Sequence, residues 1–364
     1  MISLPRLWAV ARKETIQLKR DPRSLAMAFL VPAAMIVFFG YIISFDVKDI
    51  RLAVLDQDQS QRSRQLVQAF EAAGRFRVTQ RVTNSAEIAP LLDKAVVRIA
   101  LVIPPGFQKD LDAGRPAPVQ AIVDGADANT ASVSMNYATA IIAAQNQLAL
   151  PIQVEPRVWY NEALESANMI VPGLVAVIMM IISAMLTALT IAREWERGTM
   201  EQLAATPVHP VEVIGGKLVP YLVIGMIDVT IAVTLGLTIF AVPLRGSALL
   251  LLAMAFLFLL GSLGLGIFIS AALKSQLLAT QLAMLATYLP SVLLSGLMFD
   301  IASMPLPLRI ISTVVPARYF VVVLRGVFLK GVGLSVLWPQ AAAMVAYAVV
   351  GLGLAVNAFK KEIA

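Results

Sequence analysis

Six long apolar runs constrain the fold of this chain more than any other feature of its sequence. Each run contains about 20 or more mainly apolar residues, enough for a helix to cross the hydrocarbon core of a bilayer. The whole chain is 59% hydrophobic, whereas soluble domains are about 45–50% apolar. The sequence therefore predicts an α-helical polytopic membrane protein with spans at residues 24–45, 168–192, 218–242, 247–273, 276–299 and 336–359.

The segment before the first span, residues 1–23, is basic and amphipathic. It contains six Lys or Arg residues, and positive charge beside a first span favours the cytoplasmic side of the membrane. We expect a helix that lies in the membrane interface on that side. A soluble helix packed on a partner is the alternative. The predicted apolar face of this helix comprises Leu4, Leu7, Trp8, Ala11, Thr15 and Leu18.

Residues 46–166 form a domain of different character, with ordinary charge and with hydrophobicity typical of a soluble protein. Short β-rich runs alternate with helical ones, which predicts an α/β domain with its own core. Because one inward-to-outward span precedes it, we expect an extracytoplasmic location. Strands are predicted at 51–55, 76–82, 97–103, 119–123 and 152–160, and helices at 60–73, 86–94, 106–112 and 126–150.

The apolar stretch at residues 300–335 is too hydrophobic for one exposed loop and is interrupted by prolines. We expect re-entrant helices that lie in or on the outer leaflet, since irregular backbone at that depth needs cover from protein or water. A seventh span through residues 314–329 is the alternative, and it would place the C-terminus outside. With six spans the tail, residues 360–364, is cytoplasmic, as Lys360 and Lys361 favour.

Several kinds of chemistry are excluded by the residues themselves. The chain has no cysteine and one histidine, His209, which lies between Val208 and Pro210 and is best interpreted as part of a turn. No Walker A motif is present, so ATP and Mg would be bound by a separate polypeptide. We expect no metal site, no catalytic residue and no nucleic-acid binding. The glycines of the fourth span, Gly261, Gly264 and Gly266, are interpreted as sites of close helix packing.

Polar side chains within the spans are candidates for a substrate path. Asp228 is the acid deepest in a span, and a charge there marks a functional site by default. The alternative is a buried carboxyl group bonded to Thr230, Thr280 or Gln281. An ion-coupled secondary transporter using Asp228 is a rival function, and a membrane-anchored binding protein is a third. The other path candidates are Asn168, Ser183, Thr187, Gln281, Thr287, Ser291 and Ser295.

A dense run of mixed charge follows the second span directly. Residues 193–202 contain two Arg and three Glu, and this balance of signs favours docking to a protein over contact with lipid headgroups. We interpret residues 193–217 as a cytoplasmic segment that couples the membrane spans to a partner.

Two stretches resemble the signatures of the ABC-2 type exporter permeases, which have the type V exporter fold. The first is the run from Arg193 to Leu203 followed by Thr206-Pro207, and the second precedes the last span. Asp300 follows Phe299 at a position where members of that family often have a proline. The turn at this position is therefore expected to differ in shape from that of the family. The second stretch includes Met298, Phe299, Met304, Pro305, Pro316, Tyr319, Arg325, Gly326 and Gly331.

The resemblance implies an export permease of the multidrug-efflux branch, in a bacterial inner membrane. Its implied partners are an ABC ATPase subunit, a second permease copy or a similar permease, a periplasmic adaptor protein and membrane lipid. An apolar path favours amphipathic or hydrophobic cargo, such as a drug or a lipid-like molecule. The residues implied to couple to the ATPase are Arg193, Glu194, Glu196, Arg197, Gly198, Thr199 and Glu201, and the stretch 305–330 would form helices that cap the exit.

Overall fold

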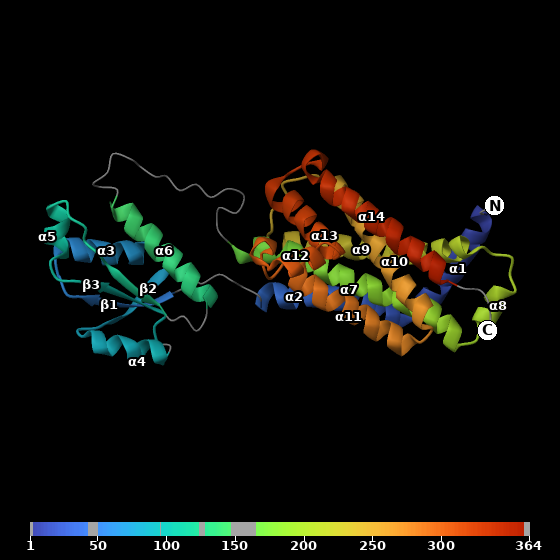
Figure 1. The fold of residues 1–364 in the computed structure, drawn as a ribbon, viewed down its shortest axis with the longest axis horizontal. Helices are drawn as coiled ribbons and strands as arrows, with labels where there is room; N and C mark the ends of the chain where they lie inside the picture. The colour runs from blue at the N-terminus through green and yellow to red at the C-terminus, as the bar shows by residue number, and fades with distance from the viewer. Residues whose placement is uncertain (1–2, 43–49, 95, 124–127, 147–164, 360–364) are drawn as a thin grey trace. The chain divides into compact units, whose positions relative to one another are not determined.

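The computed structural model describes residues 3–42, 50–94, 96–123, 128–146 and 165–359 (Figure 1). The chain divides into two compact units. One comprises residues 1–43 together with 165–364, and the other comprises residues 44–164. The predicted strand at 152–160 and the tail at 360–364 lie outside the described residues.

The first unit is helical, and six of its described helices are long and apolar enough to cross a membrane. The basic amphipathic segment at the N-terminus forms α1 (Leu4–Lys19) ahead of them. The six helices are α2 (Pro22–Ile42), α7 (Ser166–Glu196), α9 (Pro210–Thr238), α10 (Ala248–Leu273), α11 (Gln276–Leu294) and α14 (Leu334–Ala358).

Two of these helices extend well beyond the spans expected from hydropathy. α7 continues into the charged run as far as Glu196, and α9 begins at Pro210, before the predicted start at residue 218. The segment between 193 and 217 is therefore largely helical, with the short α8 (Met200–Ala204) in its middle. Because polar residues continue the backbone hydrogen bonding of a helix, hydropathy alone does not show where a spanning helix ends.

α7 is the central helix of this unit. It packs against α2, α9, α10, α11 and α13, and 89% of its most apolar window is buried inside the chain. Its neighbours, by contrast, expose broad apolar faces, as at Leu285 of α11 and Val349 of α14. A helix covered by protein on all sides, among helices exposed on their outer faces, is the arrangement expected of a bundle surrounded by lipid.

The glycines of α10 allow the closest helix contacts, as predicted. A Cβ atom at Gly266 would overlap the Ala184 carbonyl and the Thr187 side chain on α7. One at Gly264 would lie 3.2 Å from backbone atoms of Gly351 on α14. α10 therefore packs on both α7 and α14 through positions that lack side chains.

The stretch 300–335 is broken into short helices, and its expected location at the outer leaflet stays a prediction. η2 (Ile301–Ser303) and α12 (Leu306–Ser312) are followed by α13 (Pro316–Arg325) and a π-helical turn, η3 (Gly326–Lys330). The chain bends by 82° between α12 and the segment formed by α13 and η3, so these helices together form either a broken span or a re-entrant loop. α13 is buried against α7 and α10, which supplies the protein cover that such backbone needs.

The second unit is an α/β fold around a four-stranded sheet of order β2-β1-β3-β4. β1 pairs in parallel with β2 and β3, and β4 runs antiparallel to β3. The strands are β1 (Ile50–Asp56), β2 (Phe76–Arg81), β3 (Ile99–Ile103) and β4 (Gln120–Val123), close to four of the predicted runs.

Alternation along β1 divides its side chains between the two faces of the sheet. Leu52 and Val54 join the core under α3 (Gln61–Ala72), α5 (Phe107–Asp112) and α6 (Ala128–Asn146). Ala53 and Leu55 face the core under η1 (Ser85–Glu87) and α4 (Ile88–Asp93). Figure 1 shows α3 and α6 on one side of the sheet and α4 on the other.

The loop after β1 is fastened to the start of α5 by Asp58. Its carboxylate accepts hydrogen bonds from the backbone N–H of Gly106 at 2.8 Å and of Gln108 at 3.1 Å. The hydroxyl of Ser60, followed by these backbone donors, holds the pKa of Asp58 below its ordinary value. A charged cap of this kind fixes the loop that follows β3.

Candidate functional site

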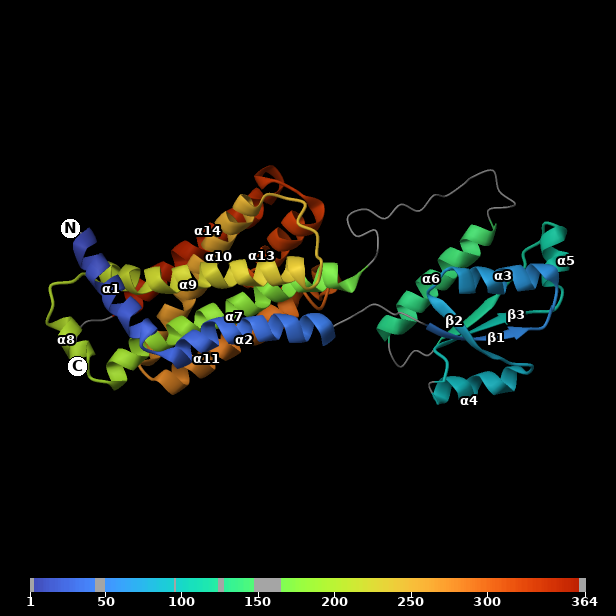
Figure 2. The ribbon, with the colours of Figure 1, turned by 180° about the vertical axis from the view of Figure 1, so that it is seen from behind.

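The candidate site lies where α1, the end of α7, α8 and the start of α9 meet. α1 packs along α9, as Figure 2 shows from behind. Gly215 and Gly216 allow this packing, because a Cβ atom at Gly216 would come within 2.7 Å of the Leu7 carbonyl oxygen and of Val10. The two glycines lie directly before Lys217, so close packing of α1 brings its side chains to this lysine.

A buried ion cluster joins α1, α7 and α9. The ammonium group of Lys217 lies 3.0 Å from a carboxylate oxygen of Glu14 on α1 and 3.2 Å from one of Glu194 on α7. Lys13 contacts the same oxygen of Glu194 at 2.9 Å. The hydroxyl of Tyr221 donates to Glu14 at 3.1 Å. Two carboxylates thus face two ammonium groups, and this balance makes burial of the charges tolerable.

Further contacts fasten both ends of α1. Arg193 pairs with Asp21 at 3.1 Å. At the other end, Glu212 accepts from the backbone N–H of Ser3 at 2.5 Å and from that of His209 at 2.8 Å. His209 is the N-cap of α9. The N-terminal helix is therefore attached to the bundle along its whole length.

The charged run 193–202 is divided by this arrangement into an inward and an outward part. Glu194 is only 4% exposed, and such burial is not compatible with the expected contact between its carboxylate and a partner. Arg193 is likewise directed to Asp21. The residues of the run that reach the surface are Glu196, Arg197, Gly198, Glu201 and Gln202, with Thr199 half-buried.

The outward part forms a sharp turn between α7 and α8. Gly198 has a φ of +69°, a left-handed conformation that strongly favours glycine. The carboxylate of Glu196 accepts from the backbone N–H of Gln276 at 2.7 Å and from the side-chain amide of the same residue. Glu196 therefore caps α11 as well as lying at the surface.

The polar residues of the spans do not converge on one site. Ser183 and Thr287 donate to carbonyls one turn back on their own helices. Thr187 donates to the Leu263 carbonyl of α10 at 3.0 Å, and the Ser295 hydroxyl accepts from the backbone N–H of Leu297. Most of these side chains satisfy backbone groups.

Three further path candidates differ in their burial. Asn168 is buried near the start of α7, whereas Gln281 is exposed on α11. Ser291 is buried, and within the described residues its hydroxyl has no hydrogen-bond partner.

Asp228 is buried on α9, with 3% of its surface exposed. Thr230 and Thr280, two of its predicted partners, donate their hydroxyl protons to carbonyls on their own helices. Neither of these hydroxyl protons is therefore donated to Asp228. The third predicted partner, Gln281, is exposed on α11.

The residues of the second signature build the broken stretch before the last helix. Pro316 begins α13, and Tyr319 donates to the Thr313 carbonyl at 2.7 Å across the bend. Arg325 donates to the carbonyls of Met169 at 3.2 Å and Gly296 at 3.0 Å, so it joins the start of α7 to the end of α11. Gly326 opens η3, and Met304 and Pro305 line an apolar pocket beside α11.

This bundle of apolar helices, with a charged turn at one end and an α/β unit inserted after α2, defines the class: a multi-pass membrane protein without a nucleotide-binding motif of its own. The particular family follows from comparison. Residues 22–357 match the model of the ABC-2 family transporter proteins. The chain belongs to this family.

Curated relatives cover nearly the whole chain. It is 36% identical to the probable multidrug ABC transporter permease YbhS of Escherichia coli, over 97% of this chain and 96% of that protein. It is 29% identical to the probable multidrug ABC transporter permease YbhR of the same organism, over 92% of each chain. It is also 28% identical to the inner membrane transport permease YhhJ of Escherichia coli, over 86% of this chain and 85% of the relative.

The sequence analysis did not identify Glu14, Lys217 or Tyr221 as members of a site. One signal was present: Glu14 is the only acid in α1, and Lys217 follows a glycine pair at the edge of an apolar run. In a hydropathy analysis, such charged residues only mark the ends of predicted spans. Only the packing of α1 on α9 brings them together.

Proposed function

We propose that this chain is the permease subunit of an ABC exporter that is powered by a separate ATPase subunit, which would bind ATP and Mg. Its cargo is an amphipathic or hydrophobic molecule, such as a drug or a lipid-like compound, moved out across the bacterial inner membrane. The names of two relatives, both probable multidrug ABC transporter permeases, support this proposal. No catalytic step is assigned to the chain itself.

The observation that carries the proposal is the exposed turn at the end of the most buried helix. Glu196 and Arg197 at the end of α7 and Glu201 on α8 are exposed, and the buried ion cluster fastens the end of α7 to α1 and α9. A force applied to the turn would therefore move α7 together with the helices packed on it. We assign this turn, with Gly198 and Thr199, as the contact with the ATPase subunit.

The proposed topology follows from the same reasoning. The N- and C-termini and the coupling turn are cytoplasmic, and the α/β unit, residues 46–166 of the sequence prediction, is outside. The stretch 300–335 lies at the outer leaflet. Two permeases, identical or similar, would form the path, and a periplasmic adaptor would meet the outer unit. The broad exposed apolar faces of α11 and α14 are available to lipid or to a second copy.

The experiment that tests the coupling role is co-purification of the tagged full chain from its native membrane. We expect a stoichiometric ATPase subunit with the wild-type chain and its loss with Glu201→Lys, because a reversed charge would face the partner. The matched control is Glu71→Lys, an exposed carboxylate on α3 of the α/β unit. Retention of the ATPase and of ATP-dependent export by Glu201→Lys would overturn the assignment.

The topology can be tested independently, because the sequence contains no cysteine. Single cysteines introduced at Glu201 and at Glu71 can be labelled with a membrane-impermeant maleimide in intact cells freed of their outer membrane and in inverted vesicles. We expect Glu71→Cys to react only from outside and Glu201→Cys only in inverted vesicles. The opposite pattern would contradict the proposed orientation.

A further inference from the structure

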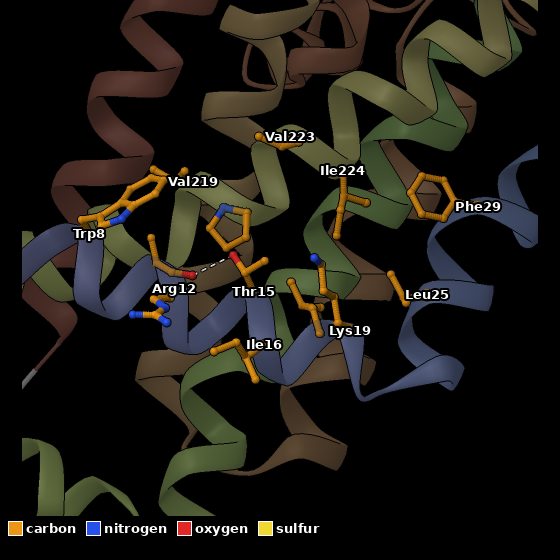
Figure 3. Close-up of a pocket in the computed structure, with 13 residues that line it drawn as sticks. Trp8, Arg12, Thr15, Ile16, Lys19, Leu25, Phe29, Val219, Val223 and Ile224 are labelled. Atoms are coloured by element: carbon orange, nitrogen blue, oxygen red, sulfur yellow. Dashed lines mark hydrogen bonds between the residues drawn. The ribbon is translucent and has the colours of Figure 1, made fainter.

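A large groove lies between α1 and the membrane-spanning helices α2 and α9. Its volume is about 700 Å³, within the range of about 300–1,000 Å³ typical of small-molecule sites. Figure 3 shows Trp8 at one end of the groove and Phe29 at the other, with Lys19 between them. The lining residues are Trp8, Ala11, Arg12, Thr15, Ile16, Leu18, Lys19, Leu25, Phe29, Val219, Pro220, Val223 and Ile224.

The walls of the groove are apolar and belong to membrane-spanning helices. Leu25 and Phe29 lie on α2, and Val219 and Val223 lie on α9, where Val223 is 55% exposed. On α1 the groove is bordered by Trp8, which is 64% exposed. An exposed tryptophan on an amphipathic helix is typical of the membrane interface. The groove is therefore open at the level of the bilayer, where acyl chains are the surrounding medium.

The polar groups of the groove are cationic. Arg12 and Lys19 lie seven residues apart on α1, two helical turns, and both line the groove. Within the described part of the chain neither makes an ion pair, whereas their neighbour Lys13 is engaged by Glu194. The hydroxyl of Thr15 donates to the Ala11 carbonyl at 2.8 Å. No Asp or Glu is among the lining residues, so the charged side chains that line the groove are all positive.

We propose that this groove is a binding site for an anionic phospholipid. The headgroup phosphate would lie between Arg12 and Lys19, and one acyl chain would fill the apolar floor formed by α2 and α9. A long apolar chain attached to an anion matches both properties of the groove. A neutral lipid would leave the two cations without a counter-charge, and a soluble anion would leave the apolar walls exposed to water.

This lipid would hold α1 from the side opposite to the ion cluster. Glu14 is turned into the bundle towards Lys217, whereas Arg12 and Lys19 are exposed and line the groove. Occupancy of the groove would therefore stabilise the attachment of α1. The lipid proposal does not rest on the assigned cargo or on the ATPase contact. If either of those assignments fails, the lipid site is unaffected, and if the lipid site fails, both assignments are unaffected.

The test is native mass spectrometry of the purified full-length chain, released from detergent after titration with dioleoyl phosphatidylglycerol or dioleoyl phosphatidylcholine. We expect the wild-type chain to retain phosphatidylglycerol in preference. Arg12→Gln/Lys19→Gln should weaken that binding about 30-fold, because each cation near anionic lipid contributes about 1 kcal/mol. The control Arg20→Gln/Lys274→Gln removes two exposed basic side chains that do not line the groove, and it should bind as the wild type does.

A second variant tests the apolar part without changing charge. Val223→Trp places a large side chain in the groove from an exposed position on α9, and it should reduce phosphatidylglycerol binding severalfold while the chain stays folded. Glycerophosphoglycerol, the headgroup without acyl chains, should not compete. Equal retention of both lipids, an equal loss in the control, unchanged binding in Val223→Trp, or competition by the free headgroup would each overturn the proposal.

Discussion

Lys217 on α9 and Glu14 on α1 form an ion pair of 3.0 Å in which both side chains are almost completely buried. Glu194 on α7 is the second carboxylate of this lysine, at 3.2 Å. Charges removed from water are tolerated only when they are paired, and the loss of one partner leaves the others uncompensated. The pair therefore makes the position of α1 depend on two helices of the bundle.

Removal of Lys217 should lower the stability of the chain substantially. Lys217→Met leaves Glu14 and Glu194 facing each other, and we expect a loss of about 3–5 kcal/mol in stability. This loss of stability can be measured as a lower unfolding midpoint of the detergent-purified chain. The folded fraction after heating is determined by size-exclusion chromatography. Lys13→Met is the control, because Lys13 is about half exposed and exposed pairs contribute about 0–1 kcal/mol. Equal midpoints for the two variants would contradict a buried pair.

A double variant separates lost attraction from the cost of orphaned charge. Glu14→Gln in the Lys217→Met background removes one of the two unpaired carboxylates. We expect it to recover part of the lost stability, measured by the same unfolding midpoint. A double variant that is no more stable than Lys217→Met would show that repulsion between the two unpaired carboxylates is not the source of the loss.

The contact between α7 and α10 should not tolerate a methyl group at Gly266. A Cβ atom there would overlap the Ala184 carbonyl and Thr187, and overpacking of this kind costs about 1–3 kcal/mol. Gly266→Ala should therefore lower the unfolding midpoint. Gly353→Ala is the matched control, since nothing lies within 4 Å of its Cβ position. Indistinguishable variants would show that α7 and α10 lie farther apart than described.

Arg325 should be required for the junction between α7 and α11. Its two hydrogen bonds, to the carbonyls of Met169 and Gly296, are each worth about 1.5–3 kcal/mol as bonds to a charged donor. We expect Arg325→Met to destabilise the chain and Arg325→Lys to rescue it only in part, because an ammonium group cannot reproduce the planar fork. Arg309→Met, at an exposed position on α12, is the control for loss of charge.

The role of Asp228 distinguishes two kinds of transport. If the chain is the permease of an ATP-driven exporter, Asp228→Asn should retain ATP-dependent export in inverted vesicles, because the amide is nearly isosteric with the carboxyl group. Collapse of the proton gradient should have no direct effect. Export that is lost in this variant and depends on the gradient instead would favour the ion-coupled alternative.

Within the α/β unit, Asp58 should control the loop before α5. Asp58→Ala removes the acceptor of the Gly106 and Gln108 amides, and the loss of such a cap costs about 0.5–2 kcal/mol. Hydrogen exchange of peptides covering residues 104–112 in the full-length chain should become faster. Asp93→Ala, a substitution on α4 away from this loop, should leave their exchange unchanged.

Much of this architecture was predictable because its determinants are local in the sequence. Apolar length alone indicates a span, so the six long helices were predicted near their observed positions. A short β-rich run indicated β1, and the Gly261–Gly266 region indicated close packing. The ends of α7 and α9 were less predictable, since charged residues can continue a helix past the edge of its apolar run.

By itself, then, the sequence determined the spans, the inserted α/β unit, the broken stretch after α11 and the place of the charged turn. Only the tertiary structure decided which charges of that turn face inward. Glu14 and Lys217 are separated by about two hundred residues and meet only because Gly215 and Gly216 allow α1 to lie against α9. Burial and pairing depend on contacts between distant segments, and no local pattern of residues encodes them.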